Sequence, residues 1–335
     1  MSKIKVAING FGRIGRIVLR QAIKNENVQV VAINDLSNVE TLAHLFKYDS
    51  IHRVYQGDVS VESGNMVVDG NNIKVFAEKD PAQLPWGDLD IDFVIESTGI
   101  FRSKETAGLH VKAGAKKVMV SAPPKGDGIK AYVLGVNEEL ITAEEDIISN
   151  ASCTTNSCAH IVKHIDENWG INKGFLTTIH AFTSDQRLHD APHSDLRRAR
   201  AASRSMIPTS TGAANAVIKL FPHLKGKFVG SAIRVPTEDG SITEMTFLVN
   251  KDVSADEINA SFKDLASNKL NGILKYNEEP IVSVDIISNP HSGIFDSTLT
   301  SSVGNLIKVS SWYDNEFGYS TRCVDLLEYY AKKFM

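Results

Sequence analysis

Three glycines near the N-terminus lie between a predicted strand and a predicted helix. In the stretch IKVAINGFGRIGRIVLRQAIKN they are Gly10, Gly12 and Gly15, which form the pattern G-x-G-x-x-G. Glycines at this spacing allow a tight turn and a close approach of the backbone to a pyrophosphate, and the start of the helix supplies N–H groups. A second strand-like run, VQVVAIND, ends at Asp35, where a carboxylate suits the ribose hydroxyls of NAD. Strand, turn, helix and acid together predict a Rossmann-type dinucleotide site.

The two halves of the chain differ in their pattern of predicted strands and helices. In the first half, strand-like runs (DFVIEST, KKVMVSAP, DIISNAS) alternate with helix-like runs such as SKETAGLHVKAG. This alternation predicts a parallel sheet with helices on its faces. Beyond residue 170, the runs GFLTTIHAFT, KFVGSAIRVP, SITEMTFLVN and PIVSVDI are rich in β-branched residues and typical of a mixed, mostly antiparallel sheet with one covered face. We therefore predict an α/β chain of two domains that meet near residue 150.

Composition excludes several classes of protein. The 335 residues carry a net charge of −4 and are 42% hydrophobic, which is ordinary for a globular protein and gives no electrostatic reason to expect nucleic acid as the main partner. No apolar run approaches the roughly 20 residues that cross a bilayer, and MSKIKVAING lacks the apolar core of a signal peptide. Three cysteines, an odd number, argue against a disulfide framework and for a reducing compartment. We expect a cytoplasmic protein without a membrane anchor.

Two of the three cysteines lie close together in SNASCTTNSCAH. Cys158 shares one helical stripe with Val162, Ile165 and Trp169, so it is expected to pack in the core. His160 and His164 fall on a different face, which we expect to be solvated. Because residues two apart diverge by about 200° on a helix, Cys158 and His160 are not expected to share a metal ion, and no metal site is predicted.

Cys153 differs because it lies where a strand gives way to a helix. A helix N-terminus lowers the pKa of a thiol and favours the reactive thiolate, although an inert thiol in a turn is an open alternative. A partner base is available in TTIHAFTSDQ, where His180 lies on a predicted strand. A lone strand histidine is more often structural, but a dinucleotide fold with a cysteine at a helix start favours the catalytic interpretation.

A further segment carries candidate anion-binding groups. Four arginines crowd the stretch around Arg198, an arrangement that in isolation is usually a solvated face or an oligomer contact. Downstream, Thr211 and Gly212 directly precede the helix AANAVIKLF, and Arg234 ends a strand. Arginines together with N–H groups at a helix start favour recognition of phosphate.

Taken together, the stretches INGFGRIGR, AINDL, ESTG, SNASCTTN, PTSTGAA, RVPT and SWYDNEFGYS resemble the phosphorylating glyceraldehyde-3-phosphate dehydrogenases, in family order and over essentially the whole chain. The resemblance implies an NAD-binding domain over residues 1–150, completed by a C-terminal helix over 316–335, and an α+β catalytic and substrate-binding domain over 151–315. It also implies a homotetramer in which the arginine-rich loop reaches a neighbouring subunit's cofactor. The implied substrates are glyceraldehyde 3-phosphate and inorganic phosphate.

The resemblance further assigns roles by position. Cys153 is implied to attack the aldehyde, with His180 as base and later acid, through a thiohemiacetal and a thioester that phosphate resolves to 1,3-bisphosphoglycerate. The residues implied to contact the dinucleotide are Gly10, Gly12, Arg13, Ile14, Gly15, Asp35, Lys79, Ser121 and Asn315. Those implied around the attacking phosphate are Ser152, Thr154, Thr211 and Gly212. Thr183 and Arg234 are implied to hold the substrate's own phosphate, with Arg198 near both.

The sequence departs from the family pattern at a few positions. Ser157 replaces a second cysteine that many relatives carry, so oxidation is expected to give a Cys153 sulfenic acid and not a local disulfide. His160 stands where proline is common and has no assigned role. Asp35 and Pro192 favour NAD, whereas the small Ala191 leaves room for some use of NADP.

Three other readings compete with phosphorylating oxidation. One is an erythrose-4-phosphate dehydrogenase-like enzyme, in which water resolves the thioester; the intact PTSTGAA segment argues against it. A second is a non-catalytic binder of nucleotide or RNA, which would not need Cys153 and His180 together. A third is a cysteine hydrolase without cofactor, which would leave the glycine motif and Asp35 without purpose. The direction of flux, glycolytic or gluconeogenic, is not encoded in any of these features.

Overall fold

The computed structural model describes residues 3–335, and the chain divides into two compact units. The first unit consists of Met1–Tyr132, Glu138–Ala151 and Ser320–Met335. The second consists of Val133–Asn137 and Ser152–Tyr319. Helix α7 (Phe317–Phe334) therefore begins in the second unit and continues through the first.

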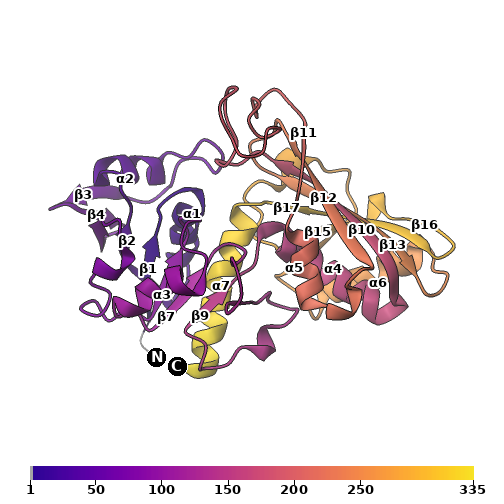
Figure 1. Cartoon of the computed structure of the whole chain (residues 1–335), viewed down its shortest axis with the longest axis horizontal. Helices are drawn as coiled ribbons and strands as arrows, with labels where there is room; N and C mark the ends of the chain where they lie inside the picture. Colours follow the sequence, from indigo (N-terminus) through magenta and orange to yellow (C-terminus); the bar gives the residue numbers. More distant parts are fainter. Residues whose placement is uncertain (1–2) are drawn as a thin grey trace. The chain divides into compact units, whose positions relative to one another are not determined.

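The first unit is built on a sheet with the strand order β3-β4-β5-β2-β1-β6-β7-β9-β8 (Figure 1). Strands β5, β2, β1, β6, β7, β9 and β8 pair in parallel, whereas β3 and β4 add an antiparallel edge. The strands are β1 (Ile4–Asn9), β2 (Val28–Asn34), β3 (Val59–Glu62), β4 (Asn65–Val68), β5 (Asn71–Phe76), β6 (Phe93–Glu96), β7 (Lys117–Val120), β8 (Lys130–Ala131) and β9 (Ile147–Ser149). The helices are α1 (Arg13–Ala22), α2 (Val39–Lys47) and α3 (Lys104–Lys112).

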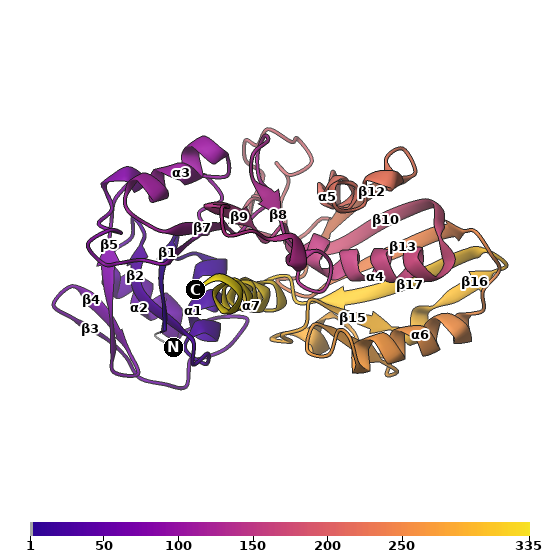
Figure 2. The same cartoon turned by 90° about the horizontal axis from the view of Figure 1, so that it is seen from below.

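The central strands of this sheet are buried on both faces, which explains their continuous apolar sequences. All four residues of β6 are buried, as are five of the six in β1. Helices α1 and α7 cover one face and α3 covers the other (Figure 2). The carboxyl ends of β1, β2 and β6 are neighbours in the sheet, so the glycine turn after β1 and Asp35 after β2 share the edge at which such folds bind nucleotides.

The second unit contains a mixed sheet in the order β11-β12-β10-β13-β17-β15-β14, with β16 paired to β17. The pairs β10–β12 and β14–β15 are parallel, and the other pairs are antiparallel. The strands are β10 (Ile171–Ala181), β11 (Ile207–Thr209), β12 (Phe228–Val235), β13 (Ser241–Val249), β14 (Leu274–Asn277), β15 (Gly293–Asp296), β16 (Ser301–Val303) and β17 (Leu306–Tyr313). The helices are α4 (Cys153–Trp169), α5 (Ala213–Leu220) and α6 (Ala255–Ser267).

The core of the second unit lies between its helices and one face of its sheet. Strand β13 alternates strictly between buried and half-buried residues, and its buried Met245 and Phe247 pack in the same cluster as Cys158 and Val162 of α4. The opposite face of the sheet carries exposed side chains, Phe175 among them. The predicted fold class, a Rossmann-type parallel-sheet unit with a second unit built on a mixed sheet, is confirmed.

Two local predictions are wrong. PIVSVDI was expected to form a strand, but Ser283–Ile286 is a short 3₁₀ helix in which Val284 is exposed and Ile286 is buried. The segment lies in the connection between β14 and β15, which are parallel and therefore need a crossover between them. His160 was expected on a solvated face but is buried: its Nδ1 lies 2.8 Å from the Asn156 carbonyl and its Nε2 lies 2.6 Å from the Leu134 carbonyl. Within residues 3–335, no helix is both long and apolar enough to span a membrane.

Candidate functional site

The N-terminus of α4 presents the thiol of Cys153. Ser152 has extended backbone and caps the helix, its Oγ accepting from the Thr155 N–H at 3.1 Å. Cys153 is thus the first helical residue, and the first turn contains no acidic residue. Because no carboxylate neutralises the positive end of the helix dipole there, that end of the dipole acts on the sulfur.

The sulfur of Cys153 faces the ring of His180, with 3.5 Å between Sγ and Nε2. The other ring nitrogen, Nδ1, lies 2.6 Å from the carbonyl oxygen of Ala181, which can only accept a hydrogen bond. Arg234 Nη1 also lies 3.0 Å from Nδ1, but it donates to the same Ala181 carbonyl at 2.9 Å, and the carbonyl is the shorter contact of Nδ1. We therefore assign the proton to Nδ1, which leaves the lone pair of Nε2 facing the sulfur. This is the tautomer that a general base for the thiol requires.

The protonation of this pair differs from the expectation that the helix start lowers the pKa of the thiol. Burial raises the pKa of Cys153, and the charge of Arg234 and the hydrogen bonds of Thr154 only oppose that rise. Burial, together with the charge of Arg234, lowers the pKa of His180 to about 3. The pair therefore rests as a neutral thiol and a neutral imidazole, because both charged forms lose hydration.

Tyr313, which is not among the predicted site residues, also belongs to the site. The hydroxyl of Tyr313 lies 2.9 Å from Thr154 Oγ1 and 2.8 Å from Thr178 Oγ1. Its ring meets the His180 ring edge-on, with centroids 5.9 Å apart. Tyr313 is buried and thereby links the first turn of α4 to strand β10. Tyr313 lies inside the stretch SWYDNE, and this position could have indicated from the sequence that it belongs to the site.

Arg234 lies at the end of β12, beside the catalytic candidates. Its Nη1 donates to the Ala181 carbonyl at 2.9 Å and to Thr183 Oγ1 at 3.3 Å. Its Nε is buried and has no hydrogen-bond partner among the residues that the structure describes. A buried guanidinium N–H without an acceptor is costly, so the group is suited to an anion. Thr183 and Arg234 are thus brought together, as predicted for one phosphate site.

Arg198 is held in place by its own acidic neighbours. Its Nε donates to Thr209 Oγ1 at 3.0 Å, and Nη1 pairs with Asp185. Thr209 belongs to β11, which pairs with β12, the strand of Arg234. The charge of Arg198 helps to lower the pKa values of both His180 and Arg234. Arg200, by contrast, makes an exposed pair with Asp190.

The start of α5 forms the other predicted anion site. Gly212 is the N-cap, no atom lies within 4 Å of the position its Cβ would take, and the first turn has no acidic residue. Thr211 Oγ1 accepts from the Ala213 N–H at 3.1 Å. The remaining N–H groups of this turn are suited to a phosphate oxygen.

The glycine turn of the first unit fits a dinucleotide. Gly10 has φ of 90°, and a Cβ there would lie 2.7 Å from the Thr98 nitrogen; a Cβ on Gly15 would lie 2.2 Å from the Gly10 oxygen. These contacts hold the turn tightly against the sheet. At Gly12, by contrast, the space is open, so the backbone at the start of α1 can approach a ligand.

Asp35 fixes this turn while keeping acceptor capacity. Its Oδ2 accepts from the Phe11 N–H at 2.8 Å and its Oδ1 accepts from the Ser37 N–H at 3.0 Å. Each carboxylate oxygen retains a lone pair for a ribose hydroxyl. Arg13, predicted to contact the dinucleotide, directs its guanidinium to Asp49 at 2.6 Å and 3.2 Å. The other predicted dinucleotide contacts of this unit are Ile14 and Ser121, which are both half-buried, and Lys79, which is exposed.

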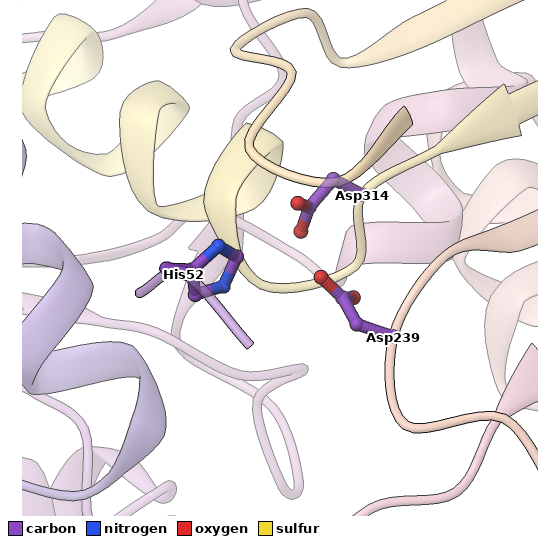
Figure 3. Close-up of side chains that lie close together, drawn as sticks. All are labelled: His52, Asp239 and Asp314. Carbon is purple, nitrogen blue, oxygen red and sulfur yellow. The ribbon is translucent and has the colours of Figure 1, made fainter. Parts of the chain in front are cut away.

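Asn315, the remaining predicted dinucleotide contact, belongs to the second unit and is buried. The residue before it in the chain, Asp314, is also buried. Its carboxyl group and that of the buried Asp239 face one another (Figure 3). Asp314 Oδ1 accepts from the N–H groups of Glu316 and Phe317 at the start of α7. Burial and the negative charge of Asp314 raise the pKa of Asp239 to about 9, so Asp239 holds its proton at neutral pH.

Comparisons with known proteins agree with this geometry. The family model "Glyceraldehyde 3-phosphate dehydrogenase, NAD binding domain" matches residues 4–104, and the model of the C-terminal domain of the same family matches residues 152–315. The chain is 57% identical over 331 residues to a glyceraldehyde-3-phosphate dehydrogenase of Thermotoga maritima, covering 98% of this chain and 99% of the relative. It is 50% identical over 332 residues to glyceraldehyde-3-phosphate dehydrogenase 1 of Bacillus subtilis and 51% identical over 332 residues to the enzyme of Geobacillus stearothermophilus, each with 98% and 99% coverage.

The nucleotide-binding unit and these relationships define an NAD-dependent oxidoreductase that acts on an aldehyde. Its cofactor is NAD, as the sequence predicted. The chain belongs to the glyceraldehyde-3-phosphate dehydrogenase family.

Proposed function

We propose that this chain oxidises glyceraldehyde 3-phosphate and couples the oxidation to inorganic phosphate, giving 1,3-bisphosphoglycerate. The observation that carries the proposal is the pairing of Cys153 and His180, with 3.5 Å between Sγ and Nε2 and with Nδ1 committed to the Ala181 carbonyl. A cysteine nucleophile with an oriented base makes an acyl-enzyme, which a dehydrogenase that only moved hydride would not need.

The first half of the reaction builds the thioester. As Sγ of Cys153 bonds to the aldehyde carbon, the thiol proton passes through His180 Nε2 to the aldehyde oxygen, which gives a thiohemiacetal. His180 then removes the proton from that oxygen as the carbon is oxidised, leaving a thioester on Cys153. NAD⁺, when bound, would supply the acceptor for the hydride that leaves this carbon. The backbone N–H of Cys153 and the His180 ring stabilise the oxyanion, and such donors contribute about 3 kcal/mol each.

The second half uses the anion-binding residues. Thr211, Gly212, Ser152 and Thr154 hold inorganic phosphate, whose oxygen attacks the thioester carbon while the carbon–sulfur bond breaks. His180, now protonated, returns its proton to the departing sulfur, so the thiol is regenerated. Arg234 and Thr183 hold the substrate's own phosphate, and the buried Nε of Arg234 supplies the donor for it. Arg198 lies near both anions.

The experiment is the formation of NADH from NAD⁺ and glyceraldehyde 3-phosphate, followed by absorbance with and without inorganic phosphate or arsenate. Strong dependence on the anion supports phosphorolysis of the acyl-enzyme. Turnover that is indifferent to the anion would mean that water resolves the thioester, as in an erythrose-4-phosphate dehydrogenase-like enzyme. Absence of turnover with intact NAD binding would favour a non-catalytic nucleotide-binding role.

We also propose that the chain works as a homotetramer in the cytoplasm. Within the segment between β10 and β11, the side chains of Leu188, Leu196 and Met206 are 70%, 82% and 75% exposed, and Phe175 is exposed on the uncovered face of the sheet. Exposed apolar groups of this size are typical of surfaces that another subunit covers. A reducing compartment keeps the thiol of Cys153 available.

A further inference from the structure

The buried hydroxyl of Ser241 lies between the base of the proposed reaction and an amide of the proposed cofactor site. Ser241 begins β13 and is buried. Its Oγ accepts from the backbone N–H of Ala181 at 3.1 Å and donates to Asn315 Oδ1 at 2.6 Å. The carbonyl of the same Ala181 accepts from His180 Nδ1 at 2.6 Å. The backbone of one residue, Ala181, and one hydroxyl therefore connect the ring of His180 to the side chain of Asn315.

These bonds fix which end of the Asn315 amide faces Ser241. The Ala181 N–H can only donate, so Ser241 Oγ accepts there and its single hydrogen is available for another acceptor. Among residues 3–335, the acceptor that it meets is the Asn315 amide, at 2.6 Å. That distance lies in the range of O–H···O bonds and is short for N–H···O bonds. The amide oxygen therefore faces Ser241, and the NH₂ group points the other way.

The NH₂ group of Asn315 is left for a ligand. Among the residues that the structure describes, it makes no hydrogen bond, although the side chain as a whole is buried. An amide can usually turn over and exchange its donor for its acceptor at little cost. Here the turned form would bring NH₂ against a hydroxyl that has already accepted one hydrogen, and it would leave the hydroxyl hydrogen without its acceptor.

We infer that Ser241 is a positioning residue that holds the Asn315 amide with its NH₂ group toward the dinucleotide and ties it to the backbone segment that orients His180. The inference rests on the proposed function, since Asn315 is assigned to the cofactor there. It adds that cofactor orientation and base orientation depend on one hydroxyl. Ser241 acts through Asn315 and Ala181 and does not itself touch the reacting atoms.

The test compares variants of the full chain by equilibrium titration with NAD⁺ alone and by the KM for NAD⁺ against the KM for glyceraldehyde 3-phosphate. Ser241→Ala is expected to weaken NAD⁺ binding about 3- to 10-fold, the usual effect of one misoriented hydrogen bond. Ser241→Thr, which keeps the hydroxyl, is expected to restore most of the affinity. In the Asn315→Ala background, Ser241→Ala is expected to cause no further loss of affinity, because its effect passes through that amide.

The matched control is Thr243→Val on the same strand. Thr243 is buried on the same face of β13 as Ser241, and its Oγ1 has no hydrogen-bond partner among the described residues. Its loss is expected to leave NAD⁺ affinity unchanged. Should Ser241→Ala fail to fold, Ser241→Cys, which keeps a side chain of similar shape but is a much weaker hydrogen-bond donor and acceptor, tests the same bonds.

Three results would overturn the inference: wild-type affinity in Ser241→Ala, an equal loss of affinity in the wild-type and Asn315→Ala backgrounds, or an equal loss in Thr243→Val. Because the titration uses NAD⁺ without aldehyde, its outcome is separate from that of the proposed reaction. A wild-type chain that binds NAD⁺ but does not oxidise glyceraldehyde 3-phosphate would contradict the reaction, while the coupling between Ser241 and Asn315 would still be decided.

Discussion

At the scale of single residues, the two cysteines of α4 show how position decides reactivity. Cys153 is half-buried at the first helical position and faces a base at 3.5 Å. Cys158 lies one and a half turns further on, fully buried in the core, where burial raises the pKa of its thiol to about 12. The same side chain therefore faces a base at one position, as the proposed nucleophile requires, and is a small apolar group at the other.

Treatment with hydrogen peroxide is expected to convert Cys153 to a sulfenic acid without forming a Cys153–Cys158 disulfide. The thiol of Cys158 stays protonated and lies on the core face of α4, and Ser157 offers no thiol. Intact mass and trapping with a sulfenic-acid reagent check this outcome. Cys158→Ala is expected to behave as wild type, whereas a mass two hydrogens lower that disappears in this variant would show the bridge.

Replacing His180 by asparagine is expected to reduce kcat by about 10²- to 10⁴-fold, because the thiol then loses the lone pair that accepts its proton. Steady-state rates with glyceraldehyde 3-phosphate measure the loss. His164→Asn is the control, since its ring is also partly buried on α4 but bonds to Ser261 and lies outside the proposed site. A similar decrease in both variants would argue against a specific role for His180.

At the scale of elements, the N-termini of helices carry residues assigned to the proposed reaction. Helices α1, α4 and α5 each begin without an acidic residue in the first turn, and each start is assigned to a different group: the dinucleotide, the reacting sulfur and the inorganic phosphate. A positive dipole end attracts negative charge only while no side chain has neutralised it. Helix α7 contrasts with them, because the carboxylate of Asp314 accepts from its first N–H groups.

The variant Asp239→Asn is expected to be more stable than the wild type at alkaline pH. The pKa of Asp239 is raised to about 9 in the folded chain, against about 4 when unfolded, so the folded state binds the extra proton between these values. Stability from this group is therefore complete below pH 4 and falls as pH rises toward 9. Thermal unfolding between pH 6 and 9 should decline more steeply in the wild type than in the variant.

The control is Asp256→Asn, because Asp256 is exposed in the first turn of α6 and its carboxylate is not buried beside a second carboxyl group. Parallel declines in all three proteins between pH 6 and 9 would mean that Asp239 does not hold its proton.

At the scale of the whole molecule, the sequence predicted the two sheet types but not their complete membership. The strands β1, β2, β10, β12 and β13 can be predicted because they are long and because burial requires continuous or alternating apolar residues. The edge strands β3 and β4 and the strands β14 to β16 are only three or four residues long, which is too short for a period to appear. Cys153 and His180 could be named from helix start and strand, whereas Tyr313 and Ser241 look like ordinary strand residues until the fold brings their hydroxyls to partners.

Substituting lysine for Phe175 is expected to lower the assembled mass of the protein. This side chain is 66% exposed on the sheet face that no helix of its own unit covers, and a charge buried at a subunit contact is costly. Sedimentation velocity of wild type and variant at equal concentration measures the change. Val303→Lys, on the β16–β17 hairpin, is the control for adding a charge at an exposed apolar position. Unchanged mass for Phe175→Lys would remove this face from the assembly.

The division of the first unit into separate stretches of chain has a consequence for synthesis. Most of that unit is complete at Ala151, yet Ser320–Met335, which supplies α7, is translated only after the whole second unit. At about 5–20 residues per second, a ribosome takes roughly 10–40 s to cover the distance. Throughout that interval the sheet of the first unit lacks one of its covering helices. The synthesis of the second unit is complete before that of the first. We therefore expect the cofactor-binding unit to complete its folding after the second unit when the chain is synthesised.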